Sequence, residues 1–320
     1  MEMPAVLKQS LETLTTGLKQ KSLKKNAQDL SLRYRTQARK GQTLINGEQD
    51  SLAYAVSRMP ATFGALSLVL EQAAALPDFS PETMVDAGAG TGSAVWAASC
   101  FFDLKKATCL ERSTEMRAVG KKLTDKAGDF FSFAPVWENF DLNNDVLPRA
   151  ELVTAAYVLN ELEEKQRLNA LSKLWEATQG VLVLVEPAAP ENFTQIKTYR
   201  QTLIEKGAFI AAPCPHQNDC PNEWCHFGCR VARSKLHRMA KGGDAPFEDE
   251  KFCYLIATRQ KYDTAACRVL RRPVIETGTV TLSLCTSEGI TERTFSKKDG
   301  ALYKAARKVK WADAFDMERK

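Results

Sequence analysis

Short apolar runs alternate with helical stretches between residues 83 and 187, and this alternation constrains the fold more than any other feature. The predicted strands are "TMVDAG" (83–88), "ATCLER" (107–112), "FSFAPV" (131–136), "ELVTAAYVL" (151–159) and "GVLVLVEP" (180–187). The helix-like stretches between them are residues 92–102, 113–128 and 163–178. Strands that are apolar on both faces and alternate with helices indicate a parallel sheet covered by helices on each side. The predicted fold class is therefore α/β.

The flanking regions suggest an N-terminal helical region and an insertion. Apolar residues recur every three or four positions in residues 1–76, which predicts helices. Two further strands are predicted at 251–259 and 278–286, after an irregular segment. We therefore expect a main domain of residues 77–187 and 251–320 with a seven-stranded sheet. Residues 188–250, including a basic helix in "CRVARSKLHRMAKGG" (229–243), are expected to be inserted between its fifth and sixth strands.

The composition is that of an ordinary globular protein, with 44% hydrophobic and 26% charged residues. The N-terminus lacks a basic lead followed by an apolar run, and no run approaches the roughly 18 apolar residues of a membrane helix. We expect a cytoplasmic protein with no membrane partner, and a monomer is favoured. Because cytoplasmic thiols stay reduced, the nine cysteines are not read as a disulfide framework.

A glycine-rich loop, "VDAGAGTG" (85–92), follows the first predicted strand and precedes a helix. Glycine suits a loop that turns sharply and lets a ligand approach the backbone. The G-x-G-x-G spacing differs from the G-x-G-x-x-G of dinucleotide-binding folds, and it resembles the first motif of class I S-adenosylmethionine-dependent methyltransferases. The resemblance implies that the loop holds the methionine part, that Glu111 binds the ribose and that Asp141 meets the adenine. The candidate cofactor-binding residues are Asp86, Gly88, Gly90, Gly92, Glu111, Asp141 and Asn160.

The sequence carries no recognisable catalytic motif after the fourth predicted strand. Methyltransferases that act on amino groups of nucleic acids carry [DN]-P-P-[FY] there, and cytosine carbon-5 enzymes use a cysteine. This chain has "VLNEL" (158–162) instead. Glu161 is a candidate general base, or a cap of the following helix. The catalytic residues stay unassigned, and so does the question of whether the protein turns over a substrate.

Four of the nine cysteines and two of the three histidines lie in "PCPHQNDCPNEWCHFGC" (213–229). The spacings between the first three cysteines are wider than the C-x₂₋₄-C pairs of most zinc knuckles. Cys-Pro pairs recur beside iron–sulfur clusters, whose usual ligands are four cysteine thiolates. His216 and His226 leave a mixed zinc site open, and an unliganded thiol cluster is the remaining alternative. The C-x₃-C-x₂-C pattern of radical enzymes does not fit.

The cysteine segment and its continuation to residue 259 resemble bacterial relatives of the mitochondrial ribosomal small-subunit assembly factors, a methyltransferase-like family. The resemblance extends to "LSLRYR" (30–35), "AYAVSRMPATFGAL" (53–66), the glycine loop and "VTLSLCTSEG" (280–289). It implies a class I methyltransferase fold with an inserted 4Fe-4S cluster, whose ligands are Cys214, Cys220, Cys225 and Cys285. Cys229 is a rival fourth ligand. The remaining cysteines, in or beside apolar runs, are expected to be small core residues: Cys100, Cys109, Cys253 and Cys267.

Two functions follow as expectations. The first is an S-adenosylmethionine-binding, 4Fe-4S-containing protein that acts on the small ribosomal subunit or its rRNA, as an enzyme or as an assembly factor. Basic segments at 19–40, 230–241 and 303–313 suit a phosphate-rich partner, although each also fits a solvated face. The alternative is a zinc-containing methyltransferase that acts on a small molecule or a protein.

Overall fold

The computed structural model describes residues 2–37, 45–220 and 224–317. The chain forms two compact units. Unit 1 is Met1–Val185 with Cys229–Glu250, and unit 2 is Glu186–Gly228 with Lys251–Lys320. The segment 188–250, predicted to be one insertion, is thus shared between the units.

The described residues of the first 76 form four helices, as the periodicity of this region predicts. They are α1 (Ala5–Thr15), α2 (Gln20–Gln37), α3 (Glu48–Ser57) and α4 (Met59–Ala74). In α2 the apolar side chains of Leu23, Ala27 and Leu30 recur at helical spacing and are buried. No single helix among the described residues is long and apolar enough to cross a membrane, although α3 and α4, bent by 50° where they meet, reach that length and apolarity together.

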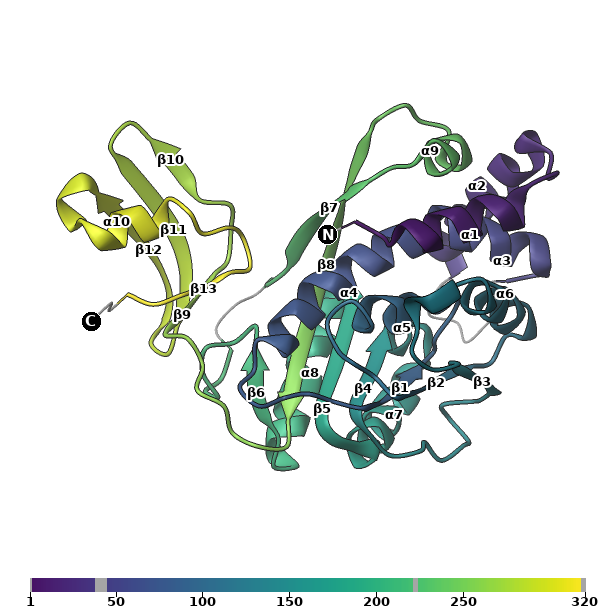
Figure 1. The fold of residues 1–320 in the computed structure, drawn as a ribbon. Helices are drawn as coiled ribbons and strands as arrows, with labels where there is room; N and C mark the ends of the chain where they lie inside the picture. Colours follow the sequence, from purple (N-terminus) through teal and green to yellow (C-terminus); the bar gives the residue numbers. More distant parts are fainter. Residues whose placement is uncertain (1, 38–44, 221–223, 318–320) are drawn as a thin grey trace. The chain divides into compact units, whose positions relative to one another are not determined.

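The parallel sheet of unit 1 matches the predicted strand–helix alternation (Figure 1). Its strands are ordered β3-β2-β1-β4-β5, and they are β1 (Thr83–Ala87), β2 (Lys106–Glu111), β3 (Val136–Asn139), β4 (Ala150–Ala156) and β5 (Thr178–Pro187). All four pairings are parallel. The connections from β1 to β3 run toward one edge of the sheet, and the connection from β4 to β5 runs toward the other. Because such crossovers are right-handed, the helices lie on opposite faces: α5 (Ser93–Ala98) and α6 (Thr114–Asp125) on one, and α7 (Glu164–Ala177) on the other.

The third strand begins later than predicted. The sequence suggested 131–136, whereas β3 begins at Val136. The aromatic residues before it pack on α5 instead: the rings of Phe130 and Phe131 lie 4.8 and 4.7 Å from the Trp96 ring. The aromatic residues before Val136 therefore reflect packing against α5 and not a β-strand.

The basic helix is shorter than predicted. It is α9 (Lys235–Lys241), and the residues before it form β7 (Phe227–Ala232). Ser234 sets the start of the helix, because its hydroxyl accepts a hydrogen bond from the His237 amide at 3.1 Å. Within unit 1, α9 packs on α2 and α3.

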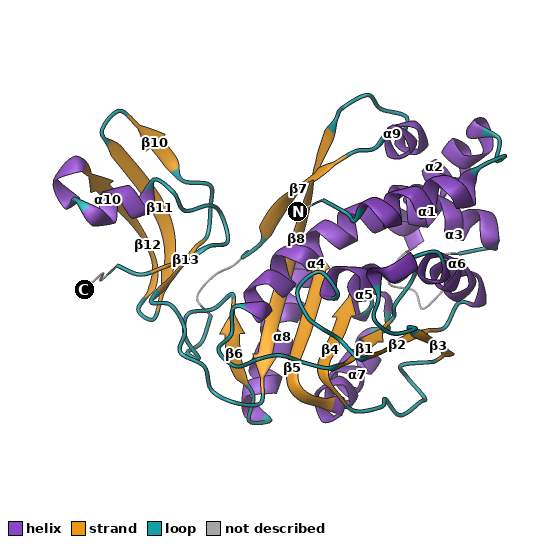
Figure 2. Ribbon diagram, viewed as in Figure 1, coloured by secondary structure: helices purple, strands orange, loops and turns teal. Residues whose placement is uncertain are grey.

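Unit 2 contains α8 (Pro190–Glu205), β6 (Phe209–Ala212) and most of β8 (Phe247–Thr258), with β6 antiparallel to β8. It also contains a second sheet of five strands, ordered β10-β11-β9-β13 with β12 beside β11 (Figure 2). These strands are β9 (Cys267–Val269), β10 (Val274–Glu276), β11 (Thr279–Thr286), β12 (Gly289–Ser296) and β13 (Ala314–Phe315). With α10 (Ala301–Ala306) they enclose a small core around Leu282, Leu284 and Phe295.

The prediction of a seven-stranded sheet was wrong. Among the described residues, the larger sheet has eight strands, which include β6 and β7 from the segment taken as irregular. Both strands are too short, at 4 and 6 residues, to show a clear period in the sequence. The predicted strand at 278–286 is β11 of the second sheet. Its alternating burial fits a strand with one covered face.

Candidate cofactor pocket and cysteine cavity

The glycine loop lies at the carboxyl end of β1, beside the carboxyl end of β4, where the strand order reverses direction. Ligands of open α/β sheets bind at this point. Gly88 has φ +72°, and a Cβ there would lie 2.5 Å from Cγ2 of Val158, which follows β4. Only glycine lets the loops after β1 and β4 approach each other this closely.

Glu111 ends β2, and its carboxylate is fixed by the backbone. One oxygen accepts a hydrogen bond from the Gly90 amide at 2.9 Å, and the other accepts one from the Ser113 amide at 2.8 Å. Because each carboxylate oxygen has two lone pairs, both oxygens can still accept a hydrogen bond from a ligand. The arrangement therefore presents an oriented carboxylate to a diol.

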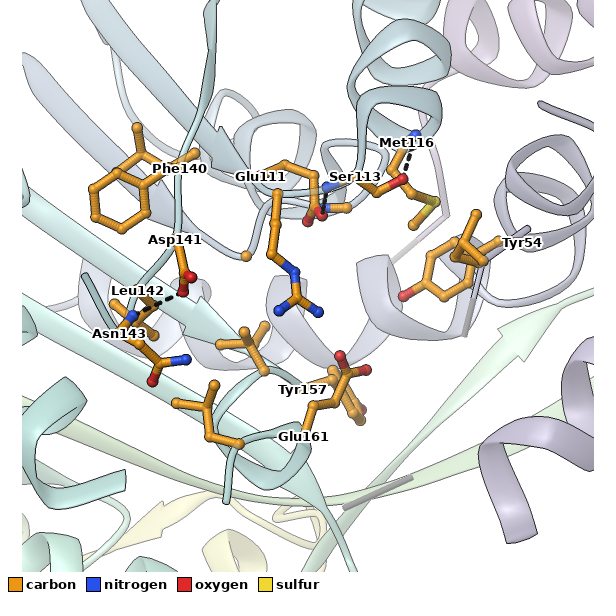
Figure 3. A pocket seen from close by; sticks show the side chains of 18 of the residues that line it. Tyr54, Glu111, Ser113, Met116, Phe140, Asp141, Leu142, Asn143, Tyr157 and Glu161 are labelled. Atoms are coloured by element: carbon orange, nitrogen blue, oxygen red, sulfur yellow. Dashed lines mark hydrogen bonds between the residues drawn. The ribbon is translucent and has the colours of Figure 1, made fainter. Parts of the chain in front are cut away.

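A pocket of about 580 Å³ opens beside this loop, and all of its lining residues belong to unit 1. Four predicted cofactor-binding residues line it: Gly88, Gly90, Glu111 and Asp141. The Asp141 carboxylate also accepts hydrogen bonds from the Asn143 amide and the Asn144 side chain, at 3.0 and 2.9 Å. Asp141 thus shapes its own turn while it faces the pocket (Figure 3).

Three other predicted residues are not among those that line the pocket. Asp86 is buried beneath the loop, and the Thr154 hydroxyl donates to its carboxylate at 2.7 Å. Burial raises the pKa of Asp86 to about 7. Gly92 has φ +93° and lies against Trp137, and Asn160 Oδ1 is buried without a hydrogen-bond partner among the described residues. A direct role for these three in cofactor binding stays a prediction.

The sequence reasoning missed the tyrosines of the pocket wall. Tyr34 from α2 and Tyr54 from α3 line it, with ring centroids 6.0 Å apart. Tyr157, which follows β4 at φ +58°, also lines it, and its hydroxyl donates to Glu250 at 3.1 Å. The family resemblance could have pointed to the first two tyrosines, because they lie in the segments "LSLRYR" and "AYAV" that carry it.

Glu161 is a pocket residue rather than a helix cap. The residue before α7 is Glu163, which makes no side-chain capping bond, and Glu161 lies in the short 3₁₀ turn Leu159–Glu161. Burial raises the pKa of Glu161 to about 8; the nearby Glu111 carboxylate adds to this, and Arg112 opposes it. Within the described part of the chain, no hydrogen bond or ion pair holds its carboxylate.

A second cavity lies entirely within unit 2, and five cysteines line it. They are Cys214, Cys220, Cys225, Cys253 and Cys285. Four of these are the predicted cluster ligands, so the fold brings Cys285 from β11 to the loop that carries the other three. Cys253, predicted to be a core residue, is the fifth. Burial raises the pKa of Cys285 to about 12 and that of Cys225 well above its usual value, so both are protonated in the metal-free protein.

Two buried arginines hold the cysteine loop. Arg268 on β9 donates from Nε to the Pro213 carbonyl at 2.7 Å, and Arg200 on α8 donates from Nη2 to the His216 carbonyl at 2.8 Å. Arg200 Nε is buried and has no hydrogen-bond partner among the described residues. Both guanidinium groups line the cavity, so the thiols lie in an electropositive interior.

Cys229 lies elsewhere. It belongs to unit 1, where its Sγ would be 3.2 Å from a Cβ placed on Gly64 of α4. It is not among the residues that line the cysteine cavity. In the described ranges, no three His, Cys, Asp or Glu side chains are arranged to hold a single metal ion.

Ion pairs neutralise part of the predicted basic surface. Glu248 accepts hydrogen bonds from Arg233 and Lys241, each at 2.6 Å, and Asp249 pairs with Arg230. Arg39 and Lys40 lie outside the described residues. Four lysines on α2 and α9 are exposed and make no ion pair with any described residue: Lys21, Lys24, Lys25 and Lys235.

Two solved methyltransferase structures show distant likeness to this chain. A magnesium protoporphyrin IX methyltransferase from Synechocystis, solved with bound S-adenosylmethionine, is 15% identical, with a TM-score of 0.43 over 73% of this chain and 97% of that one. A methyltransferase from Aquifex aeolicus is also 15% identical, with a TM-score of 0.41 over 64% of this chain and 95% of that one. Structural similarity this low supports no conclusion beyond the topology described above.

Comparison of sequences is more informative. The human mitochondrial ribosome assembly protein METTL17 is 27% identical over 299 residues, which cover 85% of this chain and 64% of METTL17. The Rsm22-cox11 tandem protein 2 of Schizosaccharomyces pombe is 26% identical over 220 residues, which cover 53% of this chain and 29% of that protein. The match thus spans less than two thirds of either relative. Residues 48–316 match the model of the mitochondrial small ribosomal subunit protein family Rsm22, so the chain belongs to the Rsm22 family.

Proposed function

We propose that this protein binds S-adenosylmethionine, carries a 4Fe-4S cluster and acts in assembly of the small ribosomal subunit through its rRNA. The observation that carries the ribosomal part is the family match over residues 48–316. The human relative is named as a ribosome assembly protein. Both named relatives are mitochondrial, and the cytoplasmic location of this chain stays a prediction.

The pocket of unit 1 supports binding of S-adenosylmethionine. Glu111 offers an oriented carboxylate that would bind the ribose hydroxyls, Asp141 lines the same pocket and would meet the adenine amino group, and Gly88 and Gly90 would leave room for the methionine part. A volume of about 580 Å³ suits a ligand of this size. The sequence "VLNEL" after β4 lacks the known catalytic motifs, which favours an assembly role over methyl transfer.

The cysteine cavity supports the proposed 4Fe-4S cluster, because four cysteines that are far apart in the sequence line it together. Cys214, Cys220, Cys225 and Cys285 would hold it. The buried Arg200 and Arg268 would offset the negative charge that four thiolates bring.

Metal analysis tests the cluster. The protein is purified without oxygen, and iron, sulfide and zinc are measured for wild type, Cys285→Ser and Cys229→Ser. About four irons and four sulfides per chain are expected, lost with Cys285 and kept without Cys229. One zinc and no iron would reject the cluster and favour the zinc-containing methyltransferase.

Binding to ribosomal particles tests the partner. The protein is mixed with small subunits and with naked rRNA, and co-sedimentation is followed as salt rises. We expect retention at low salt and progressive loss at high salt, as for contacts with phosphates. Failure to co-sediment with either at low salt would reject the ribosomal role.

A further inference from the structure

The pocket wall formed by Glu161, Tyr34 and Tyr54 has a chemistry that the proposed contacts to adenine and ribose do not use. The three residues come from separate elements, the turn after β4, α2 and α3, and all line the same pocket. Figure 3 shows Asp141 and Phe140 at one end of the pocket, Tyr54 at the other, and Glu111 and Glu161 between them.

This wall suits a positive charge. The Glu161 carboxylate has no hydrogen-bond or ion-pair partner among the described residues. The two tyrosine rings, 6.0 Å apart and inclined by 42°, add π faces that attract cations. Burial raises the pKa of Glu161 to about 8, against the opposing effect of Arg112 in the same pocket, so its carboxyl group is largely protonated at neutral pH. A cationic ligand offsets the cost of ionising it there, and a neutral ligand does not.

The position along the pocket identifies the charge. If adenine lies at Asp141 and ribose at Glu111, the sulfur of the cofactor follows the ribose, toward Glu161 and Tyr54. That sulfur is a sulfonium in S-adenosylmethionine and a neutral thioether in S-adenosylhomocysteine. The two molecules are otherwise alike apart from the methyl group.

We propose that Glu161, Tyr34 and Tyr54 form a cation-binding subsite that distinguishes S-adenosylmethionine from S-adenosylhomocysteine by the charge on sulfur. The inference rests on the proposed function, because it assumes that the pocket binds this cofactor. In an assembly factor, the subsite makes occupancy depend on the supply of the methylated cofactor without any transfer of the methyl group.

Calorimetric titration of the full chain with both compounds tests the subsite. Wild type is expected to bind S-adenosylmethionine about tenfold more tightly than S-adenosylhomocysteine, since one charge contact of this kind contributes about 1–2 kcal/mol. Glu161→Gln removes the charge and is expected to abolish the preference by weakening S-adenosylmethionine alone. Glu164→Gln, the same change on the exposed surface of α7, is the matched control.

The rings are tested separately. Tyr34→Phe keeps a π face and is expected to keep the preference, whereas Tyr34→Leu is expected to reduce it about threefold. Thermal melting of each variant shows whether it is folded. If it is not, sinefungin, which carries an ammonium in place of the sulfonium, tests the charge on wild type: it should bind like S-adenosylmethionine.

The outcomes separate this inference from the proposed function. Equal affinity for both compounds in wild type and in Glu161→Gln would overturn the subsite and leave cofactor binding intact. A Glu161→Gln variant that loses both compounds equally would assign Glu161 a structural role instead. If wild type binds neither compound, the proposed function itself fails.

Discussion

Arg268 and Cys285 are directly paired across the antiparallel ladder between β9 and β11, and the same arginine donates a hydrogen bond to Pro213, the residue before Cys214. One buried residue therefore connects the strand that carries Cys285, through its backbone, with the loop that carries Cys214, through its side chain. Its second guanidinium contact, to the Ala312 carbonyl at 2.9 Å, ties the C-terminal segment to the same point.

Arg268→Met is expected to destabilise unit 2 and to lower the iron content that the proposed cluster predicts. The change leaves the carbonyls of Pro213 and Ala312 without their charged donor, which costs roughly 3 kcal/mol. Iron content and anaerobic thermal melting measure the effect. Lys261→Met, which removes a positive charge at an exposed position of unit 2, is the control. An Arg268→Met protein with full iron content and an unchanged melting temperature would contradict this prediction.

Gly88→Ala is expected to unfold the loop and abolish cofactor binding. The new Cβ would contact Val158 at 2.5 Å, and φ +72° adds backbone strain, for a total of roughly 2–4 kcal/mol. Val158→Ala in the same chain relieves the steric part but not the strain. Denaturation of the single and double variants measures the coupling, which should be favourable by about 1 kcal/mol or more. Additive effects would argue against the contact.

Much of unit 1 was predictable from the sequence, because its signals are local. Strands apolar on both faces, with helices between them, predicted β1, β2, β4 and β5, and the glycine spacing predicted the loop at Gly88. The acid at the end of β2 was also predicted to lie near this loop, and Glu111 lines the pocket beside it, although its role in cofactor binding stays a prediction.

What was not predictable depends on contacts between distant segments. The strand at 131–136 was misplaced because Phe130 and Phe131 pack on Trp96 instead. The short β6 has no readable period, and the second sheet depends on the pairing of β9, β11 and β13. The pocket tyrosines were missed for the same reason, since Tyr34 and Tyr54 reach the pocket only through the packing of α2 and α3.

The buried Asp86 makes unit 1 less stable as the pH rises. Its pKa is about 7 in the folded protein and near 3.8 in the unfolded chain, so the folded state holds the extra proton. Stability therefore falls between about pH 4 and pH 7, by at most roughly 4 kcal/mol, and stays low above pH 7. The Asp86→Asn variant is expected to lack this fall in stability between pH 4 and pH 7. Urea denaturation of both proteins at pH 5 and pH 8 measures it, and parallel pH dependence of the two would contradict the prediction.

Glu248→Gln is expected to loosen the segment formed by β7, α9 and β8. Burial opposes the ionisation of Glu248, but hydrogen bonds from its neighbours His237, Lys241 and Arg233 outweigh burial and hold its pKa well below the usual range. This stabilisation is present above about pH 4.5 and is lost as the pH falls through the lowered pKa.

The variant leaves the cationic side chains of Arg233 and Lys241 without their shared carboxylate, at a cost of roughly 2 kcal/mol. Hydrogen exchange of residues 229–250 should become faster. Asp249→Asn removes the neighbouring pair with Arg230, whose side chains are 37% and 60% exposed, and should change the stability by less than about 0.5 kcal/mol. Equal effects of the two variants would show that burial of the Glu248 cluster contributes nothing.

The exposed lysines of α2 and α9 are expected to bind the phosphates of rRNA. They lie on helices that pack on each other, and Lys24 reaches Gly242 at the end of α9, so their charges add on one part of unit 1. Reversal of Lys21, Lys25 and Lys235 to glutamate should weaken binding to rRNA and lower the slope of log affinity against log salt by about 2–3.

The matched control reverses three exposed lysines of unit 1 that already have acidic partners: Lys105, Lys121 and Lys165. Because both variants change the net charge equally, an equal loss in both would mean that rRNA responds only to net charge. A selective loss in the first variant locates the contact on α2 and α9.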